Sequence, residues 1–546
     1  MHKKLVLAAV LLSASSLRAQ VGETIEVRVT NVDVVVTDSK GNPVAGLSKN
    51  DFDLFEDGRK QDISNFYEIR GEAAKPASSA EATTEPAMEA PVEVRKRRIV
   101  FFIDNYSIHP FRRNDVFRSI DKQLDQIVRD GDEAMIATWS RGLRIVQPFT
   151  KDRAVLRAAM KDVGRNGAVS ISLATQRRMV QEKVNMILQA AQMRSSRGGG
   201  GVNPDELASI VRAYSDEVAL NAKLLLEAMN ATLTAMAGME GKKVMVFAGA
   251  HLPEKPAAEL FTWLANLGAA GGMSMIAQES HRSLSVDIEK LARNANANGV
   301  TVYMIDTADP EGSGAEVGEA PDANVAFTEF TNTALAFQAI SRITGGVALT
   351  ASRNFDFAVQ TVARDLGSYY SLGYHPSDDK PGSRHIVVKA RNPEYSVRSR
   401  SSYVSKTLDQ QMEDRVVSNI FNAPPSSELA IRVETAGPKK QGGAYLIPIT
   451  VTILPELTLL PQDGDDVAGG FTVYIALGDS RGAMSPVSKQ QHPIRMTAGA
   501  AKQMMAKPLV YTADVLVRPG EHTLSVAVVD QVSNSAGFAR TKVVAK

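Results

Sequence analysis

Residues 97–104, RRIVFFID, decide the fold of this chain. The stretch is a nearly continuous apolar run, which is typical of a strand in a parallel sheet covered on both faces. It ends at Asp104, and a short polar stretch, NYSIHP at 105–110, separates it from a segment with helical spacing. Ligands of open α/β sheets bind at the carboxyl ends of the strands. Two interpretations of Asp104 are therefore possible: it binds a metal ion, or it only stabilises the turn that follows the strand.

The same alternation of strand and helix continues over residues 98–375. Apolar strands are separated by segments whose apolar residues recur three and four positions apart, which predicts a doubly wound α/β sheet. EAMIATWS at 133–140 and LRIVQPFT at 143–150 are joined only by Arg141 and Gly142. This spacing predicts a tight hairpin and one antiparallel strand at the edge of the sheet.

The flanking segments have different compositions. Residues 21–70 alternate apolar and polar side chains and predict a small N-terminal β module. Residues 71–97 are rich in Ala, Pro, Glu, Ser and Thr and predict a disordered linker. Residues 376–426 are interpreted as a β extension and a second linker. Residues 427–546 contain short strands between Gly and Pro turns, which predicts an immunoglobulin-like β-sandwich.

Residues 164–241 interrupt the α/β pattern and predict a helical insertion of unknown role. Two helical stretches there are rich in methionine, which either fills the core between the helices or forms an adaptable binding surface. The core interpretation is favoured because methionine commonly fills gaps in cores. The residues concerned are Met179, Met186, Met193, Met229, Met236 and Met239.

The first residues and the overall composition bear on location. Residues 1–19 have a basic start, a short apolar run and small residues before Ala19, as in a secretory signal peptide. No later stretch is apolar enough for an integral membrane segment. The chain has no cysteine, which excludes disulfides, thiol catalysis and a lipid anchor on cysteine. The net charge of +1 provides no field for nucleic acid. We expect an exported protein, periplasmic or extracellular.

The middle domain resembles a von Willebrand factor A (VWA) domain. The resemblance rests on the order of RRIVFFID, the hairpin, KDRAVLRAAMKDV and GKKVMVFAGA. The stretches VVVTDSKGNPVAGLSKNDF and SYYSLGYHP make the wider arrangement similar to secreted VWA-related bacterial proteins, best known from acidobacteria. The resemblance covers roughly residues 25–404. It implies a VWA or Rossmann-like fold for the middle domain and a binding function.

The resemblance also implies a metal-ion-dependent adhesion site (MIDAS), whose first motif is Asp-x-Ser-x-Ser. Asp104 matches the aspartate, but the serine positions fall on Tyr106 and Ile108, and Ser107 lies one residue out of register. The aspartate expected after the fourth strand falls on Gly249 or Ala250. This degenerate set favours Asp104 as a cap of the following turn over Asp104 as a Mg²⁺ ligand. We expect no cofactor.

No catalytic set is apparent in the sequence, and we expect that the protein is not an enzyme. His109 and His251 follow the first and fourth core strands, and a secreted hydrolase that uses them is one alternative. The others are a Mg²⁺-dependent adhesion module with Asp104 as ligand and an inert structural scaffold. The favoured hypothesis is an exported, metal-independent protein-binding or adhesion-type protein. Its unidentified partner would contact the carboxyl-end face through Asp104, Tyr106, Ser107, Trp139 and His251.

Overall fold

The computed structural model describes residues 29–71, 73–76, 96–108, 110–165, 173–197, 203–267, 282–308, 323–350, 354–378, 380–424, 427–462, 464–479 and 481–546. The predicted signal peptide over 1–19, most of the predicted linker over 71–97, and His109 lie outside these residues. Within them, no helix combines the length and the apolar character that crossing a membrane requires.

The middle of the chain forms a mixed sheet in the order β11-β10-β9-β6-β7-β8. Neighbouring strands are parallel except at the edge, where β8 runs antiparallel to β7, so the predicted hairpin is confirmed. The strands are β6 (Arg97–Asp104), β7 (Glu133–Trp139), β8 (Leu143–Thr150), β9 (Lys242–Gly249), β10 (Val300–Asp306) and β11 (Ala348–Leu349).

The apolar run of β6 serves both faces of this sheet. Ile99, Phe101 and Ile103 pack into one hydrophobic cluster, whereas Val100 and Phe102 pack into the other. A strand buried on both faces needs apolar residues at every position, which explains the continuous run. The covering helices are α1 (Pro110–Ile127), α2 (Arg153–Arg165) and α9 (Phe355–Gly367) on one face, and α4 (Pro204–Ala235), α7 (Ser285–Ala297) and α8 (Ala323–Thr344) on the other.

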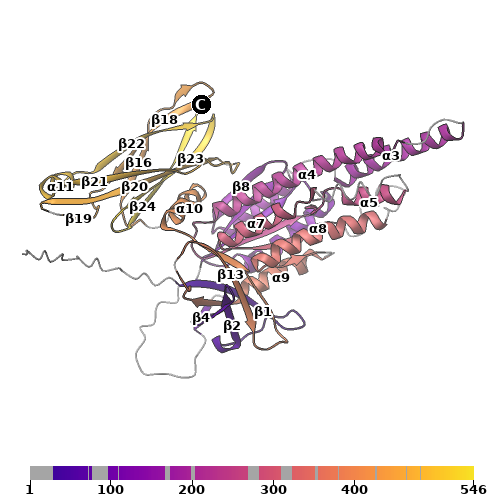
Figure 1. Cartoon of the computed structure of the whole chain (residues 1–546), viewed down its shortest axis with the longest axis horizontal. Helices are drawn as coiled ribbons and strands as arrows, with labels where there is room; N and C mark the ends of the chain where they lie inside the picture. Colours follow the sequence, from indigo (N-terminus) through magenta and orange to yellow (C-terminus); the bar gives the residue numbers. More distant parts are fainter. Residues whose placement is uncertain are drawn as a thin grey trace, which may run out of the picture.

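A group of helices extends beyond the end of the sheet where the parallel strands have their carboxyl ends. We call this end the carboxyl edge. The second half of α4 packs on the sheet, but its first half, from Leu207 to Val218, belongs to a separate cluster with α3 (Leu173–Ser195) and α5 (Ala258–Asn266). Figure 1 shows α3, α4, α5 and α8 running together away from the N-terminal strands and from the β-rich C-terminal region. We call α3, α5 and the first half of α4 the helical extension. The predicted insertion over 164–241 thus shares its core with α5.

The N-terminal strands are completed by strands that follow the middle domain. One sheet has the order β14-β1-β12-β4-β5 and the other β15-β13-β2-β3, with one core between them. The strands are β1 (Thr30–Thr37), β2 (Phe52–Glu56), β3 (Arg59–Gln61), β4 (Ile63–Arg70), β5 (Ala73–Pro76), β12 (Ser368–Tyr374), β13 (Gly382–Ala390), β14 (Ser396–Ser399) and β15 (Ser402–Ser405).

This pairing corrects three predicted boundaries. The strands of the predicted module over 21–70 and of the predicted extension over 376–426 form a single sandwich, and β12 belongs to it rather than to the domain predicted over 98–375. The reason is the apolar face of β1, since Val32 and Val34 share one hydrophobic core with residues of both β2 and β12. At the ends of the predicted linker over 71–97, β5 pairs with β4 and Arg97 begins β6.

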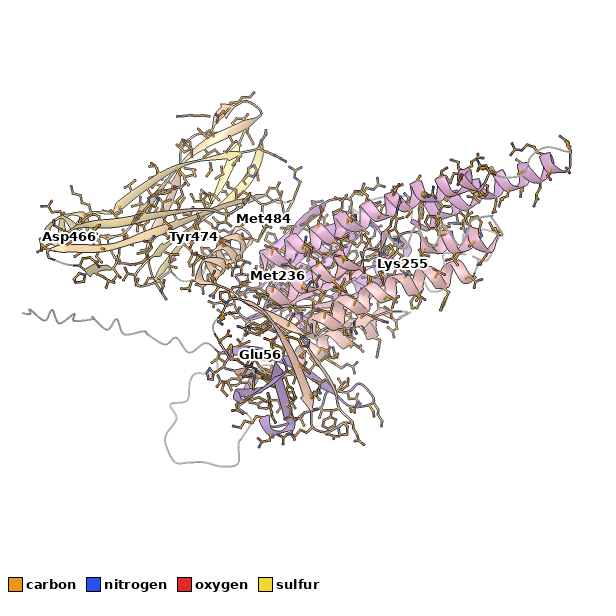
Figure 2. All side chains as sticks on the ribbon, in the orientation of Figure 1. Glu56, Met236, Lys255, Asp466, Tyr474 and Met484 are labelled. Atoms are coloured by element: carbon orange, nitrogen blue, oxygen red, sulfur yellow. The ribbon has the colours of Figure 1, made fainter. Side chains whose placement is uncertain are left out.

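The C-terminal region is a β-sandwich that packs against the helix before it and against the hairpin of β7 and β8. Its two antiparallel sheets enclose their own core. The helix α10 (Leu408–Phe421) packs Val416 and Ile420 against Tyr474 and Met484, which Figure 2 labels. The elements are β16 (Ile431–Thr435), β17 (Lys439–Gln441), β18 (Ala444–Ile453), β19 (Leu459–Pro461), β20 (Asp466–Asp479), β21 (Ser488–Thr497), α11 (Ala498–Met504), β22 (Leu509–Val517), β23 (Gly520–Asp530) and β24 (Ala536–Ala545).

Candidate functional site

Asp104 lies at the carboxyl end of β6, as predicted, and is only 1% exposed. Its Oδ1 accepts hydrogen bonds from the backbone N–H of Tyr106 at 3.1 Å and of Ser107 at 3.2 Å. Its Oδ2 accepts one from the Ser107 hydroxyl at 2.6 Å. Burial raises the pKa of Asp104 to about 6, although these hydrogen bonds act in the opposite direction. Asp104 therefore holds the turn that follows β6.

Ser107 connects this turn to the neighbouring strand. Its Oγ accepts a hydrogen bond from the backbone N–H of Ala250 at 2.8 Å, directly after β9. At Gly249, an added Cβ would lie 2.6 Å from the ring of Phe247 and 3.0 Å from Asp104 Cβ, so a larger side chain would displace its neighbours. The hydrogen bond between Ser107 and Ala250 ties the end of β6 to the end of β9.

The residues at this edge do not fit a magnesium site of the adhesion type. Tyr106 and Ile108 occupy the two serine positions and are buried, and Gly249 offers no oxygen from a side chain. Across the described ranges, no group of three or more His, Cys, Asp or Glu side chains is placed to hold a metal ion. A single carboxylate whose two oxygens already accept hydrogen bonds is a poor site for Mg²⁺.

Three predicted partner contacts, Asp104, Tyr106 and Trp139, are corrected by the structure, because their side chains are buried. Tyr106 is 7% exposed and Trp139 is 4% exposed, and both belong to the core between the sheet and α4. The Tyr106 hydroxyl accepts hydrogen bonds from Arg141 Nη2 at 3.1 Å and from Asn221 Nδ2 at 3.3 Å. These side chains anchor α4 to the sheet and are not available to a partner.

Arg141 is a surface residue of this edge that the sequence did not single out. It occupies the hairpin turn with a φ of 61°, and its guanidinium lies 5.1 Å from the centre of the Tyr106 ring. It also forms an ion pair of 3.0 Å with Glu217, and both side chains are about half exposed. The only sequence signal was its place in a turn of two residues.

His251 lies in a buried polar cluster that no sequence pattern indicated. Its side chain is 9% exposed, and its Nδ1 lies 3.7 Å from Glu329 Oε1. Arg177 of α3 forms an ion pair with Glu329 and is itself 10% exposed. Burial, followed by the charge of Arg177, lowers the pKa of His251 to about 4. Glu259, in the first turn of α5, is 1% exposed and has a pKa raised by burial.

The structure thus brings together two of the predicted residues, Asp104 and Ser107, in one hydrogen-bonded turn. It places His251 in a different environment, next to Glu329 and Arg177. It moves Tyr106 and Trp139 from the surface into the core. His109 lies outside the described residues.

No protein-family model matches this chain, and no curated protein matches it. Solved structures show only weak similarity. An aerotolerance-related membrane protein from Bacteroides fragilis has 9% identity and a TM-score of 0.25, over 50% of this chain and 98% of that one. BatB from Bacteroides thetaiotaomicron has 11% identity and a TM-score of 0.24, over 50% and 97% of the two chains. The PilB minor pilin from Streptococcus sanguinis has 10% identity and a TM-score of 0.23, over 62% and 86%. At these TM-scores the similarities carry no argument about this chain.

Proposed function

We propose that this chain is an exported, non-catalytic protein-binding protein of adhesion type that engages its partner without a metal ion. In this proposal the middle domain is VWA-like and the C-terminal sandwich is immunoglobulin-like. The sequence motifs of the middle domain and the sheet with helices on both faces support the first assignment. Two antiparallel sheets around one core support the second.

The hydrogen bonds of Asp104 support the proposal that binding does not depend on a metal ion. Both carboxylate oxygens accept from groups of the same turn, and Ser107 Oγ accepts from Ala250. A cation at this position would have to replace these bonds without gaining the serine and aspartate ligands that Tyr106, Ile108 and Gly249 replace.

The observation that supports protein binding is a row of exposed methionines on α3. Met179, Met186 and Met193 are 57%, 62% and 66% exposed, and a spacing of seven places them on one side of the helix. The opposite side holds Val184 and Ala191, which are buried at 0% and 1%. We call the three residues the methionine row. It corrects the core interpretation for these residues, whereas Met229, Met236 and Met239 are in the core as predicted.

Exposed methionines at regular spacing suit an adaptable protein contact. The thioether side chain is flexible and polarisable, and it adjusts to an apolar partner surface. The row lies on the helical extension beyond the carboxyl edge of the sheet, with α3 running away from both sandwiches (Figure 1). The proposed contact is therefore on the predicted side of the domain, but on α3 rather than on Tyr106 and Trp139.

Crosslinking of the full chain to proteins of the cell envelope tests this proposal. The triple variant Met179→Gln, Met186→Gln, Met193→Gln should lose the crosslinked partner, and a chelator should leave the wild-type crosslink unchanged. The matched control replaces three exposed apolar residues of the C-terminal sandwich, Val510, Leu516 and Val544, by Gln. Loss of the partner with chelator would revive Mg²⁺-dependent adhesion. Loss in the control variant alone would assign the contact to the sandwich.

A separate measurement tests whether the chain binds Mg²⁺ at Asp104. Calorimetric titration of Mg²⁺ and Mn²⁺ into wild type and Asp104→Ala should show no saturable binding to either. Saturable binding to the wild type that disappears in Asp104→Ala would contradict the proposal and identify Asp104 as a ligand.

His251 is the one observation that favours the hydrolase alternative. Its Nε2 is buried and has no hydrogen-bond partner among the described residues. However, a pKa of about 4 makes the imidazole a weak base at neutral pH. A broad hydrolase screen of wild type and His251→Ala distinguishes the alternatives: we expect no activity, and activity that His251→Ala abolishes would favour the enzyme.

A further inference from the structure

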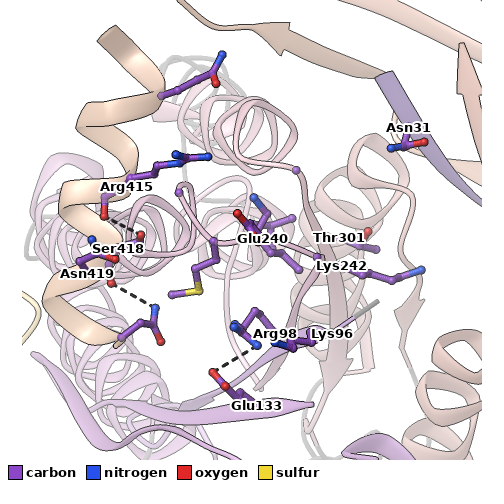
Figure 3. A pocket seen from close by; sticks show the side chains of 18 of the residues that line it. Asn31, Lys96, Arg98, Glu133, Glu240, Lys242, Thr301, Arg415, Ser418 and Asn419 are labelled. Carbon is purple, nitrogen blue, oxygen red and sulfur yellow. Dashed lines mark hydrogen bonds and ion pairs between the residues drawn. The ribbon is translucent and has the colours of Figure 1, made fainter. Parts of the chain in front are cut away.

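A large cavity lies at the end of the middle sheet where the parallel strands begin. We call this end the amino edge; it is opposite the carboxyl edge. The volume of the cavity is about 1630 Å³. It is lined by residues from both sandwiches, from α10, and from the first residues of the strands β6, β9 and β10. Figure 3 shows Lys96, Arg98 and Lys242 on the sheet side and Arg415 and Asn419 on α10. Cavities between domains are common ligand sites.

Basic side chains predominate in the lining. The cations are Lys96, Arg98, Lys242, Lys243, Arg398, Arg400 and Arg415, and the carboxylates among the described lining residues are Asp33, Glu133, Glu240 and Glu428. Some of these charges compensate one another, since Arg98 pairs with Glu133 at 3.3 Å and Lys242 with Asp33 at 3.4 Å. Arg398 pairs with Asp365 at 2.8 Å.

Lys243 and Arg400 lack such compensation. Neither forms an ion pair with any carboxylate in the described part of the chain. Lys243 Nζ donates a hydrogen bond to the carbonyl of Ala237 at 3.0 Å, and Arg400 Nη2 donates one to the carbonyl of Asn31 at 2.6 Å. Arg400 Nε is buried and finds no hydrogen-bond partner among the described residues. Most of their donor capacity therefore remains unused.

The two cations are neighbours above Gly299, the residue before β10. A point 3.6 Å from Arg400 Nη1 and 3.8 Å from Lys243 Nζ is marked by the position that a Cβ on Gly299 would take. Burial lowers the pKa of Lys243 to about 8, and the charges of Lys406 and Arg400 act in the same direction. Lys406 itself is neutralised by Asp414 at 2.6 Å. Asp414 acts on the charge of Lys243 and Asp33 on that of Arg400, but neither carboxylate forms an ion pair with these cations. Two neighbouring cations thus line the cavity without an ion-paired carboxylate among the described residues, and an anion could pair with both.

We propose that Lys243 and Arg400 form a binding site for a phosphate monoester in this cavity. A dianion matches two cations that have no ion-pair partner among the described residues, whereas a single carboxylate would leave one of them unpaired. The three outer oxygens of a phosphate accept from an ammonium and from the fork of a guanidinium at the same time. The cavity is larger than the roughly 300–1,000 Å³ of common ligand pockets, so the phosphate has room for an attached group such as a sugar.

Calorimetric titration of the full chain with inorganic phosphate and with glucose 6-phosphate tests the site. We expect saturable binding that weakens roughly tenfold or more in Lys243→Met and in Arg400→Gln, because each removes a charge-assisted hydrogen bond. The sugar phosphate should bind more tightly than inorganic phosphate. Equal affinity would identify free phosphate as the ligand and overturn the monoester assignment. Absence of binding to wild type, or equal binding to the variants, would overturn the site.

Two controls separate charge from folding. Lys243→Arg keeps the charge and should retain binding, so a loss there would mean that the lysine contributes packing rather than charge. The matched control replaces two exposed basic residues of the C-terminal sandwich, Arg432→Gln with Lys440→Met, and should bind like wild type. The methionine triple variant should also bind phosphate normally, so failure of this site and failure of the partner proposal are distinguishable.

Discussion

Two titratable residues near the carboxyl edge are held in environments that favour their neutral forms. Asp104 is 1% exposed, and the side chain of His251 is 9% exposed. Burial penalises the charged form of each, so it raises the pKa of the acid and lowers the pKa of the base. Their effects on folding stability therefore have opposite signs over the same range of pH.

The pH dependence of the free energy of unfolding should show these opposite effects of Asp104 and His251. The pKa of His251 is about 4 in the fold against 6.5 for the free side chain, so wild type loses the contribution of His251 as the pH falls from 6.5 to 4. The pKa of Asp104 is about 6 against 3.8, so the contribution of Asp104 is lost as the pH rises from 3.8 to 6. Each effect amounts at most to about 1.4 kcal/mol per pH unit.

Urea unfolding at pH values from 4 to 7 measures these slopes. Relative to wild type, His251→Gln should lose less stability on acidification, and Asp104→Asn should lose more. Constant offsets between the variants do not matter, because only the slopes are compared. Identical slopes in all three proteins would contradict the assigned pKa shifts.

At the scale of the element, a helical period predicts two faces but not which one is buried. In α3, residues at a spacing of seven form one stripe with Val184 and Ala191 and another with Met186 and Met193. Only the arrangement of α4 and α5 decides that the first stripe faces the core. The sequence alone could not separate these methionines from Met229, because methionine is common in both settings.

Replacement of individual methionines should reproduce this division. Met229 is 0% exposed in the core, so Met229→Ala should lower the free energy of unfolding by about 2–5 kcal/mol. The triple Gln variant of the methionine row should change it by no more than about 0.5 kcal/mol per site, because exposed substitutions cost little. Denaturant unfolding measures both. A large loss in the triple variant would mean that the row is covered within the folded chain.

At the scale of the whole molecule, local patterns predicted the middle sheet but not the N-terminal sandwich. Strands such as β6 are continuous apolar runs and follow one another with helices between them, so their order was accessible to sequence reasoning. Val32 instead lies opposite Leu372, beyond the whole middle domain, and no local signal fixes such a pairing. The role of Asp104 as a turn cap was predictable, but the burial of Tyr106 depended on Asn221 of α4.

The position of the C-terminal sandwich depends on close contact between α10 and the turn before β9. A Cβ added at Gly238 would lie 2.4 Å from the Cα and 2.5 Å from the backbone nitrogen of Arg415, so only glycine allows the helix this near. Because both contacts are backbone atoms, they cannot rotate away. Tyr474 fixes α10 to the sandwich by donating a hydrogen bond to Asp409 Oδ1 at 2.6 Å. A shift of α10 should therefore carry the sandwich with it.

Gly238→Ala should accordingly move the C-terminal sandwich away from the middle domain and open the amino-edge cavity. We expect a larger radius of gyration by small-angle X-ray scattering, because the sandwich would move with α10. The core of the sandwich is its own, so its unfolding should be unchanged. Gly437→Ala is the matched control, since a Cβ there meets nothing within 4 Å. A radius of gyration unchanged in Gly238→Ala would mean that the turn before β9 yields instead, and that α10 rather than Gly238 sets the distance between the domains.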